Sequence, residues 1–107
     1  MITVVTTNDL PGYEVEEVFG EVFGVTVRSR NLGSNIGASF RSIVGGEDGA
    51  YVKLVTETRD HAVARLREAA EAMGANAVLM MRFDSSEIAG SMNEVVAYGT
   101  AVRVSKK

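Results

Sequence analysis

The chain has 107 residues, 46% of them apolar and 23% charged, which suits one domain with a single hydrophobic core. Its net charge of −3 argues against a nucleic-acid partner, because binding to phosphates requires a surplus of basic side chains. The absence of cysteine excludes disulfides, zinc–thiolate sites and thiol nucleophiles, and we expect a cytoplasmic protein. Because no apolar run reaches membrane-spanning length and no signal pattern opens the chain, we expect no membrane partner.

The first 30 residues predict two strands. Residues 1–7 (MITVVTT) are β-branched and apolar enough for a short strand, which the turn-forming residues 8–12 end. Residues 13–30 predict a long strand that bends at Gly20 and Gly24, because glycine tolerates the irregular backbone of a bulge. Four acids without a base begin this strand, and we interpret them as guards against unwanted edge pairing rather than as a cation site: Glu14, Glu16, Glu17 and Glu21.

The middle of the chain predicts helical structure. Residues 31–46 are rich in glycine and small polar residues and fit a short capped helix. A long helix follows from Asp48 to Met73, because apolar or small residues recur every three or four positions on one face. Gly74 then fits the left-handed residue that ends a helix.

The last third predicts a hairpin, with a strand over residues 77–83, a loop over 84–93 and a strand over 94–104. The predicted fold class is therefore α+β, in the order β-β-α-β-β, with one long helix packed on a small antiparallel sheet.

Both strands of this hairpin are apolar on both sides. An antiparallel sheet under one helical layer normally has one polar, hydrated face. Further copies of the chain could cover the second apolar face, since exposed apolar patches of that size usually mark interfaces. The alternative is a short helix or a loop of the same chain folded over that face.

Four segments resemble the YbjQ-like family of small bacterial proteins, which carries the label "putative heavy-metal-binding". They are residues 27–47 (VRSRNLGSNIGASFRSIVGGE), 74–78 (GANAV), 81–84 (MRFD) and 94–102 (EVVAYGTAV). The resemblance covers essentially the whole chain as a single domain, residues 1–107. It implies a subunit similar to that of dodecin and assembly into a ring, a pentamer in this family, in which the N-terminal strand helps to join neighbours.

The family label raises a metal site, and metal sites need histidine, cysteine or clustered carboxylates. Asp84, Glu87 and Glu94 lie around the predicted hairpin and could hold a hard divalent cation if a ring brings copies together. His61 has no second soft ligand three or four residues away, so we interpret it as a surface or packing residue. Three methionines offer thioethers to a soft metal, although methionine in a strand mostly fills a core: Met80, Met81 and Met92.

An anion site is the second candidate. Arg28, Arg30 and Arg41 bracket a glycine-rich loop that opens the short helix, and helix N–H groups with arginine can hold a phosphate or a carboxylate. The loop lacks the spacing of a nucleotide-binding fingerprint. The alternative is that these arginines pair with the acidic strand of a neighbouring subunit.

Catalysis has the least support, because no cysteine and no Ser/His/Asp spacing is present. Arg82 and Asp84 share one side of a strand, as do Tyr98 and Thr100, and a buried Arg–Asp pair is commonly structural. We therefore expect no enzyme and no cofactor beyond a divalent or heavy-metal ion. The expected function is a homo-oligomeric module that binds a heavy metal or a small ligand, and the alternative is a scaffold whose ring is itself the functional part.

Overall fold

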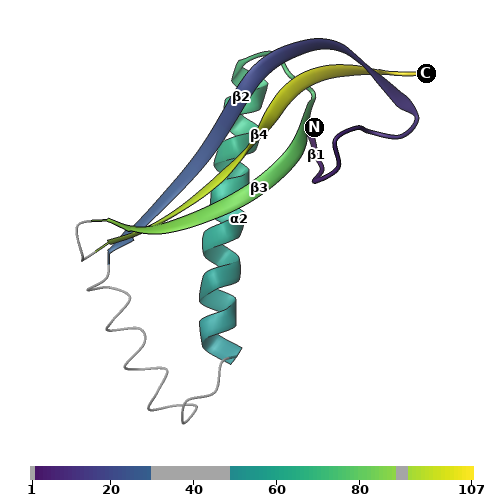
Figure 1. The fold of residues 1–107 in the computed structure, drawn as a ribbon. Helices are drawn as coiled ribbons and strands as arrows, with labels where there is room; N and C mark the ends of the chain where they lie inside the picture. Colours follow the sequence, from purple (N-terminus) through teal and green to yellow (C-terminus); the bar gives the residue numbers. More distant parts are fainter. Residues whose placement is uncertain (1, 30–48, 89–91) are drawn as a thin grey trace.

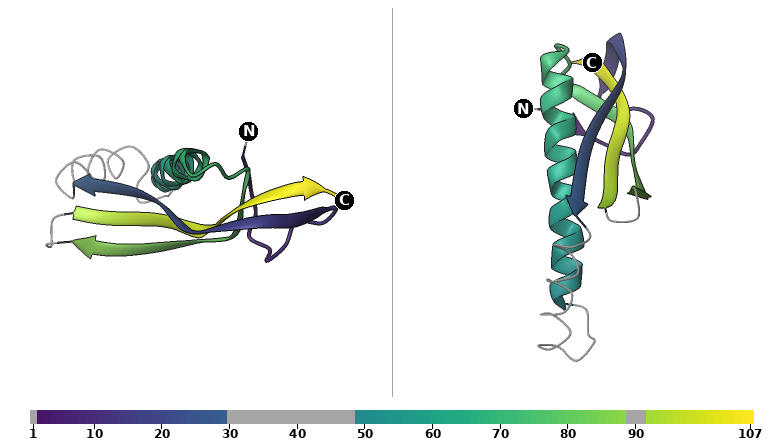
Figure 2. Two further views of the ribbon diagram at one scale, coloured as in Figure 1. Left: turned by 90° about the horizontal axis from the view of Figure 1, so that it is seen from above. Right: turned by 90° about the vertical axis from the view of Figure 1, so that its left-hand side faces the viewer.

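The computed structural model describes residues 2–29, 49–88 and 92–107, without the side chains of residues 28, 29, 49–51, 87, 88 and 92. Within these ranges the elements are β1 (Thr3–Val4), β2 (Tyr13–Ser29), α2 (Gly49–Ala72), β3 (Ala77–Ile88) and β4 (Met92–Lys106). The α+β class and the order β-β-α-β-β confirm the prediction, with the helix on one face of the sheet (Figures 1 and 2). The predicted short helix over 31–46 lies outside the described residues.

The sheet is mixed, with strand order β1-β3-β4-β2. β4 pairs antiparallel with β3 and β2, whereas β1 runs parallel to β3 through the pairs Thr3–Ala77 and Val4–Val78. The purely antiparallel sheet that we predicted is therefore wrong. The reason is that the first strand pairs at the β3 edge, and residues 8–12 then carry the chain to the opposite edge, where β2 begins (Figure 1).

α2 confirms the predicted long helix and its end. Thr58, Ala62, Leu66 and Ala70 recur every four residues and are buried against the sheet, mainly over β2 and β4. Gly74 has a positive φ of 92°. Its N–H donates to Glu71 O (3.0 Å) and the Ala75 N–H donates to Ala70 O (3.1 Å), which is the bond pair of a Schellman motif. No helix in the described ranges is both long and apolar enough to span a membrane.

The two glycines of β2 have different roles. Gly20 has a φ of 110° and lies where the register of β2 against β4 shifts, so the predicted bend is confirmed there. At Gly24 the ladder is regular, and a bend at this position is wrong. A Cβ at Gly24 would overlap the Ala62 carbonyl oxygen and lie 2.9 Å from Leu66 Cα. Gly24 therefore lets the helix backbone approach the sheet closely.

The hairpin strands are longer than predicted. Asp84 to Ile88 continue β3, and β4 begins at Met92, so most of the predicted loop over 84–93 belongs to the ladder. Polar residues such as Ser85 and Ser86 favour a loop by local propensity, but pairing with Val95 and Glu94 overrides it.

Apolar clusters lie on both faces of the sheet. Under α2, the buried stripe of the helix meets Val22, Val78, Ala97 and Ala101. On the face away from α2, which we call the back face, Ala77, Leu79, Val102 and Val104 form a second cluster against Val5 and Leu10. The N-terminal segment, which includes Val5 and Leu10, thus covers one half of the back face (Figure 2, left).

A bulge in β3 holds this segment in place. The Met80 N–H donates to Thr7 O (2.9 Å), the Met81 N–H donates to Val5 O (3.0 Å), and Arg82 Nη1 donates to Thr6 O (2.9 Å). The register against β4 shifts between Leu79 and Arg82, and Met80 has a positive φ of 55°. This left-handed conformation is costly for any residue other than glycine.

We expect Gly24→Ala to lower the free energy of unfolding by about 3 kcal/mol, because the added methyl must push α2 off the sheet. Urea denaturation at a fixed chain concentration measures this loss. Glu16→Ala in the same strand is the control, since its exposed side chain should change stability by less than about 0.5 kcal/mol. Equal stability of the two variants would contradict the close approach.

We expect Met80→Gly to raise the free energy of unfolding by about 1 kcal/mol, because glycine adopts the left-handed conformation without strain. Met81→Gly should lower it instead, since the Met81 side chain packs against the core under the helix. Thermal denaturation of both variants makes the comparison. A loss of stability in Met80→Gly, as at an ordinary strand position, would refute the strained bulge.

Candidate interaction surface

The half of the back face beyond the N-terminal segment carries exposed apolar side chains. Phe23, Val25 and Val27 of β2 are 51%, 40% and 48% exposed. The register of β2 against β4 places Tyr98 opposite Phe23 and Val96 opposite Val25, and both of these side chains are half-buried. We call these five residues the open face.

The open face follows from the alternation of β2. Val22, Gly24 and Thr26 point under the helix and are buried, so the residues between them must point to the back. The prediction that the hairpin strands are apolar on both sides is confirmed for β4, which turns Val96 and Tyr98 to the back face and Ala97 and Ala101 to the helix. The alternative of cover within one chain holds for the half under Val5 and Leu10, whereas no described residue covers the open face.

Four charged residues whose side chains are described border the open face, and three of them are acidic. Strand register places Asp84 beside Val96, Glu94 beside Val27 and Glu21 beside Thr100, all on the back face. Arg82, beside Tyr98, is the basic residue of this group.

Arg82 and Asp84 share one side of β3, as predicted, but they do not form a buried pair. Both residues are exposed, and the Arg82 guanidinium donates to the carbonyl oxygens of Thr6 and Met81 (2.9 Å each). Arg82 therefore anchors the N-terminal segment to β3.

The predicted metal residues lie on the paired strands rather than in a loop. Ser86 pairs with Glu94, and Asp84 is two residues before Ser86, so Asp84 and Glu94 share the back face as diagonal neighbours. Glu87 occupies the next position of β3, opposite Asn93, and its side chain is not described. Among the described side chains, no group of three or more histidine or acidic residues could hold a metal ion.

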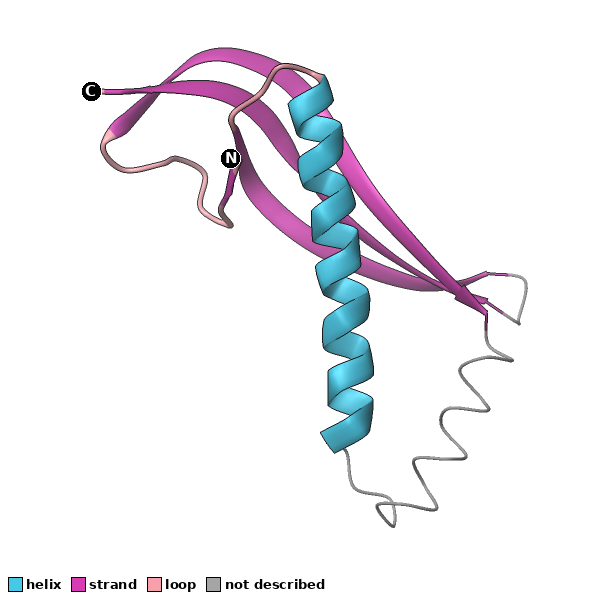
Figure 3. Cartoon of the chain, turned by 180° about the vertical axis from the view of Figure 1, so that it is seen from behind, coloured by secondary structure: helices cyan, strands magenta, loops and turns pink. Residues whose placement is uncertain are grey.

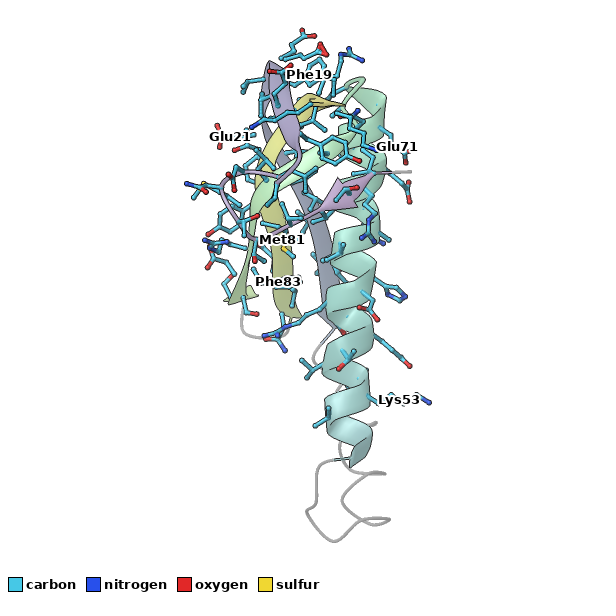
Figure 4. The ribbon with its side chains drawn as sticks, turned by 90° about the vertical axis from the view of Figure 1, so that its right-hand side faces the viewer. Phe19, Glu21, Lys53, Glu71, Met81 and Phe83 are labelled. Atoms are coloured by element: carbon cyan, nitrogen blue, oxygen red, sulfur yellow. The ribbon has the colours of Figure 1, made fainter. Side chains whose placement is uncertain are left out.

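The soft-ligand candidates are dispersed. Met81 packs against the core under the helix, whereas Met80 is exposed in the β3 bulge; Figure 4 shows Met81 and Phe83 along β3. His61 is exposed on α2, on the other side of the sheet from Asp84. The side chain of Met92 is not described. The structure therefore brings none of the described methionines beside His61.

The predicted anion site falls largely outside the described residues. Arg28 belongs to β2 and pairs in register with Asn93, and its side chain is not described. Arg30 and Arg41 lie outside the described ranges, so the anion site stays a prediction.

Two arginines that sequence reasoning did not single out make aromatic contacts. Arg59 of α2 lies over the Phe83 ring (5.1 Å to its centroid) and Arg103 over the Phe19 ring (5.4 Å). Arg103 also forms an ion pair with Glu17 (3.6 Å), an acid of the strand that we expected to attract arginines from a neighbour. No sequence spacing indicates these pairs, because each joins elements far apart in the chain.

Comparison with known proteins places this fold in a family. Residues 1–105 match the model of the YbjQ family, which is described as "Putative heavy-metal-binding". The chain belongs to this family. The resemblance seen in the sequence is thus confirmed over nearly the whole chain.

Relatives within the YbjQ family come from distant organisms. The chain is 61% identical to a UPF0145 protein of Streptomyces coelicolor, over 97% of this chain and 98% of that one. It is 54% identical to a UPF0145 protein of Sulfurisphaera tokodaii, over 98% and 92% of the two chains. A crystal structure of a DUF74-family protein of unknown function from Pediococcus pentosaceus has a similar fold, with a TM-score of 0.56 and 16% identity over 97% and 98% of the chains.

Proposed function

We propose that this protein is a self-assembling binding module, in which copies of the chain cover one another's open face, and that it is not an enzyme. The observation that carries the proposal is the row of Phe23, Val25 and Val27, which lie side by side with about half of each side chain exposed to water. Burying a fully exposed side chain of this kind contributes about 1.5–3 kcal/mol, so covering the exposed half of each would contribute about half of that.

The edges of the sheet support the same proposal. Among the described strands, β2 pairs with β4 alone, and β1 pairs with β3 only at Ala77 and Val78. The outer edge of β2, a strand of 17 residues, offers a row of backbone donors and acceptors to another chain, apart from Val25 O, which accepts from Arg65 Nη1. A closed ring satisfies such edges without leaving a growing end, and the family resemblance leads us to expect a pentamer.

We expect native mass spectrometry of the unmodified protein to show an assembly of several copies. Val25→Glu should shift the population to single chains, because a carboxylate would then face the apolar contact. Ala64→Glu introduces the same charge at an exposed position of α2 and should leave the assembly intact. A wild-type protein that stays monomeric at micromolar concentration would contradict the proposed function.

A second candidate function is the binding of a divalent cation by Asp84 and Glu94. The favouring observation is that these residues occupy diagonal positions on the back face, a relation with a typical spacing of about 7 Å between residues, and that the family is described as "Putative heavy-metal-binding". Two carboxylates fill few of the six to eight positions around Ca²⁺, so further ligands must come from a neighbouring copy.

Calorimetric titration with Ca²⁺, Zn²⁺ and Cu²⁺ tests this second function. We expect a stoichiometric heat signal with one of these ions, which disappears in the double variant Asp84→Asn/Glu94→Gln because the ion then has no charged ligand. The variant His61→Ala should retain the signal. Silence of the assembled wild-type protein with all three ions would eliminate cation binding at this position.

A further inference from the structure

Among the described residues, nothing covers a second apolar surface, on the N-terminal half of α2. Val52 and Val55 are 58% and 40% exposed, and they lie three residues apart on one side of the helix. The strands turn away from this half of the helix, so the helix extends past the part of the sheet that it covers (Figures 1 and 3). Lys53 projects from the same half, away from the strands (Figure 4).

Arg59 belongs to the same side of the helix. Positions 52, 55 and 59 are separated by three and four residues, and such residues lie on one side of an α-helix. The contact of Arg59 with the Phe83 ring shows that this side borders β3. We call Val52, Val55 and Arg59 the helix flank.

The helix flank and the open face cannot meet within one chain, because they lie on opposite sides of the sheet. Building on the self-assembly proposed above, we propose that the helix flank of one copy packs on the open face of the next. A helix side is convex and the open face belongs to a sheet, and packing a helix on a sheet is one of the stable two-layer arrangements of proteins.

Charge complementarity favours this pairing over contact between two open faces. The open face is flanked by Asp84, Glu94 and Glu21, with Arg82 as the opposing charge. Two open faces in contact would bring these acids together, which costs free energy. The helix flank instead contributes the guanidinium of Arg59, and the residues around it are balanced in charge, with Lys53 as a base and Glu57 and Asp60 as acids.

The proposed contact is heterologous, because two different surfaces meet. Each copy then offers one helix flank and one open face, so that copies add head to tail until the ring closes. The proposed contact also gives Asp84 and Glu94 a cationic partner other than a metal ion, namely Arg59 of the next copy.

Mixing two blocked variants tests the pairing. Val25→Glu blocks the open face and leaves the helix flank, whereas Val55→Glu blocks the helix flank and leaves the open face. Neither variant should form rings alone. An equimolar mixture, with one variant labelled with nitrogen-15, should give one-to-one dimers in native mass spectrometry, because one intact contact remains for each pair. We expect these dimers at a concentration at least about tenfold lower than any self-association of either variant.

The outcomes separate this inference from the proposed function. If the wild-type protein assembles but the mixture gives no mixed dimer, or if Val55→Glu assembles as the wild type does, the pairing is wrong and self-assembly stands. A monomeric wild-type protein would overturn both. Circular dichroism must show that each variant is folded. If Val25→Glu or Val55→Glu does not fold, Val27→Lys blocks the open face and Val52→Lys blocks the helix flank in their place.

An exchange of charges tests whether Arg59 of one copy attracts Asp84 of the next across the proposed contact. Arg59→Glu should weaken assembly about tenfold, and the added substitution Asp84→Lys should restore it, because the two charges then attract again. Ala64→Glu with Asp84→Lys is the matched control; it should assemble about tenfold more weakly than the wild type, because the new lysine then faces the intact Arg59. Failure of the exchange to restore assembly, together with no mixed dimers, would overturn the pairing of these two surfaces.

Discussion

The structure depends on one mismatch: the sheet is apolar on both faces, and the chain has one described helix to cover them. α2 covers one face so closely that Gly24 has no room for a side chain. On the other face, Val102 and Val104 are buried by the N-terminal segment, whereas Phe23 and Val25 remain exposed. The hydrophobic effect penalises this exposure in proportion to its area, and this penalty is the physical basis of the proposed association.

Holding the N-terminal segment on the back face requires backbone strain in β3. A left-handed Met80 allows β3 to bulge, and the bulge directs two backbone N–H groups at Val5 and Thr7. The strain is offset by three hydrogen bonds, including the one from Arg82, and by the burial of Leu79 under the segment. This cover ends near Arg82, and that is where the open face begins.

Periodicity and local backbone chemistry made part of the fold predictable. The helix, its end at Gly74 and the bulge at Gly20 follow from spacing and from the conformations open to glycine. The mixed sheet, the extended hairpin and the contact at Gly24 depend on which segments meet in space, which no local pattern specifies. The same limit applies to the candidate site: the two apolar faces were predictable, but the contact of Arg59 with Phe83 was not.

The contact of Arg59 with Phe83 also bears on the direction of assembly. A long arginine side chain loses rotamer freedom when a partner fixes it, and this loss opposes binding. Stacking on Phe83 already restricts the guanidinium beside the exposed valines of the helix, so part of that loss occurs on folding rather than on association. The acids around the open face have no such restraint among the described contacts. A pre-ordered cation on one surface and surplus acid on the other give the two sides of the chain different roles, which favours a head-to-tail ring over a two-fold dimer.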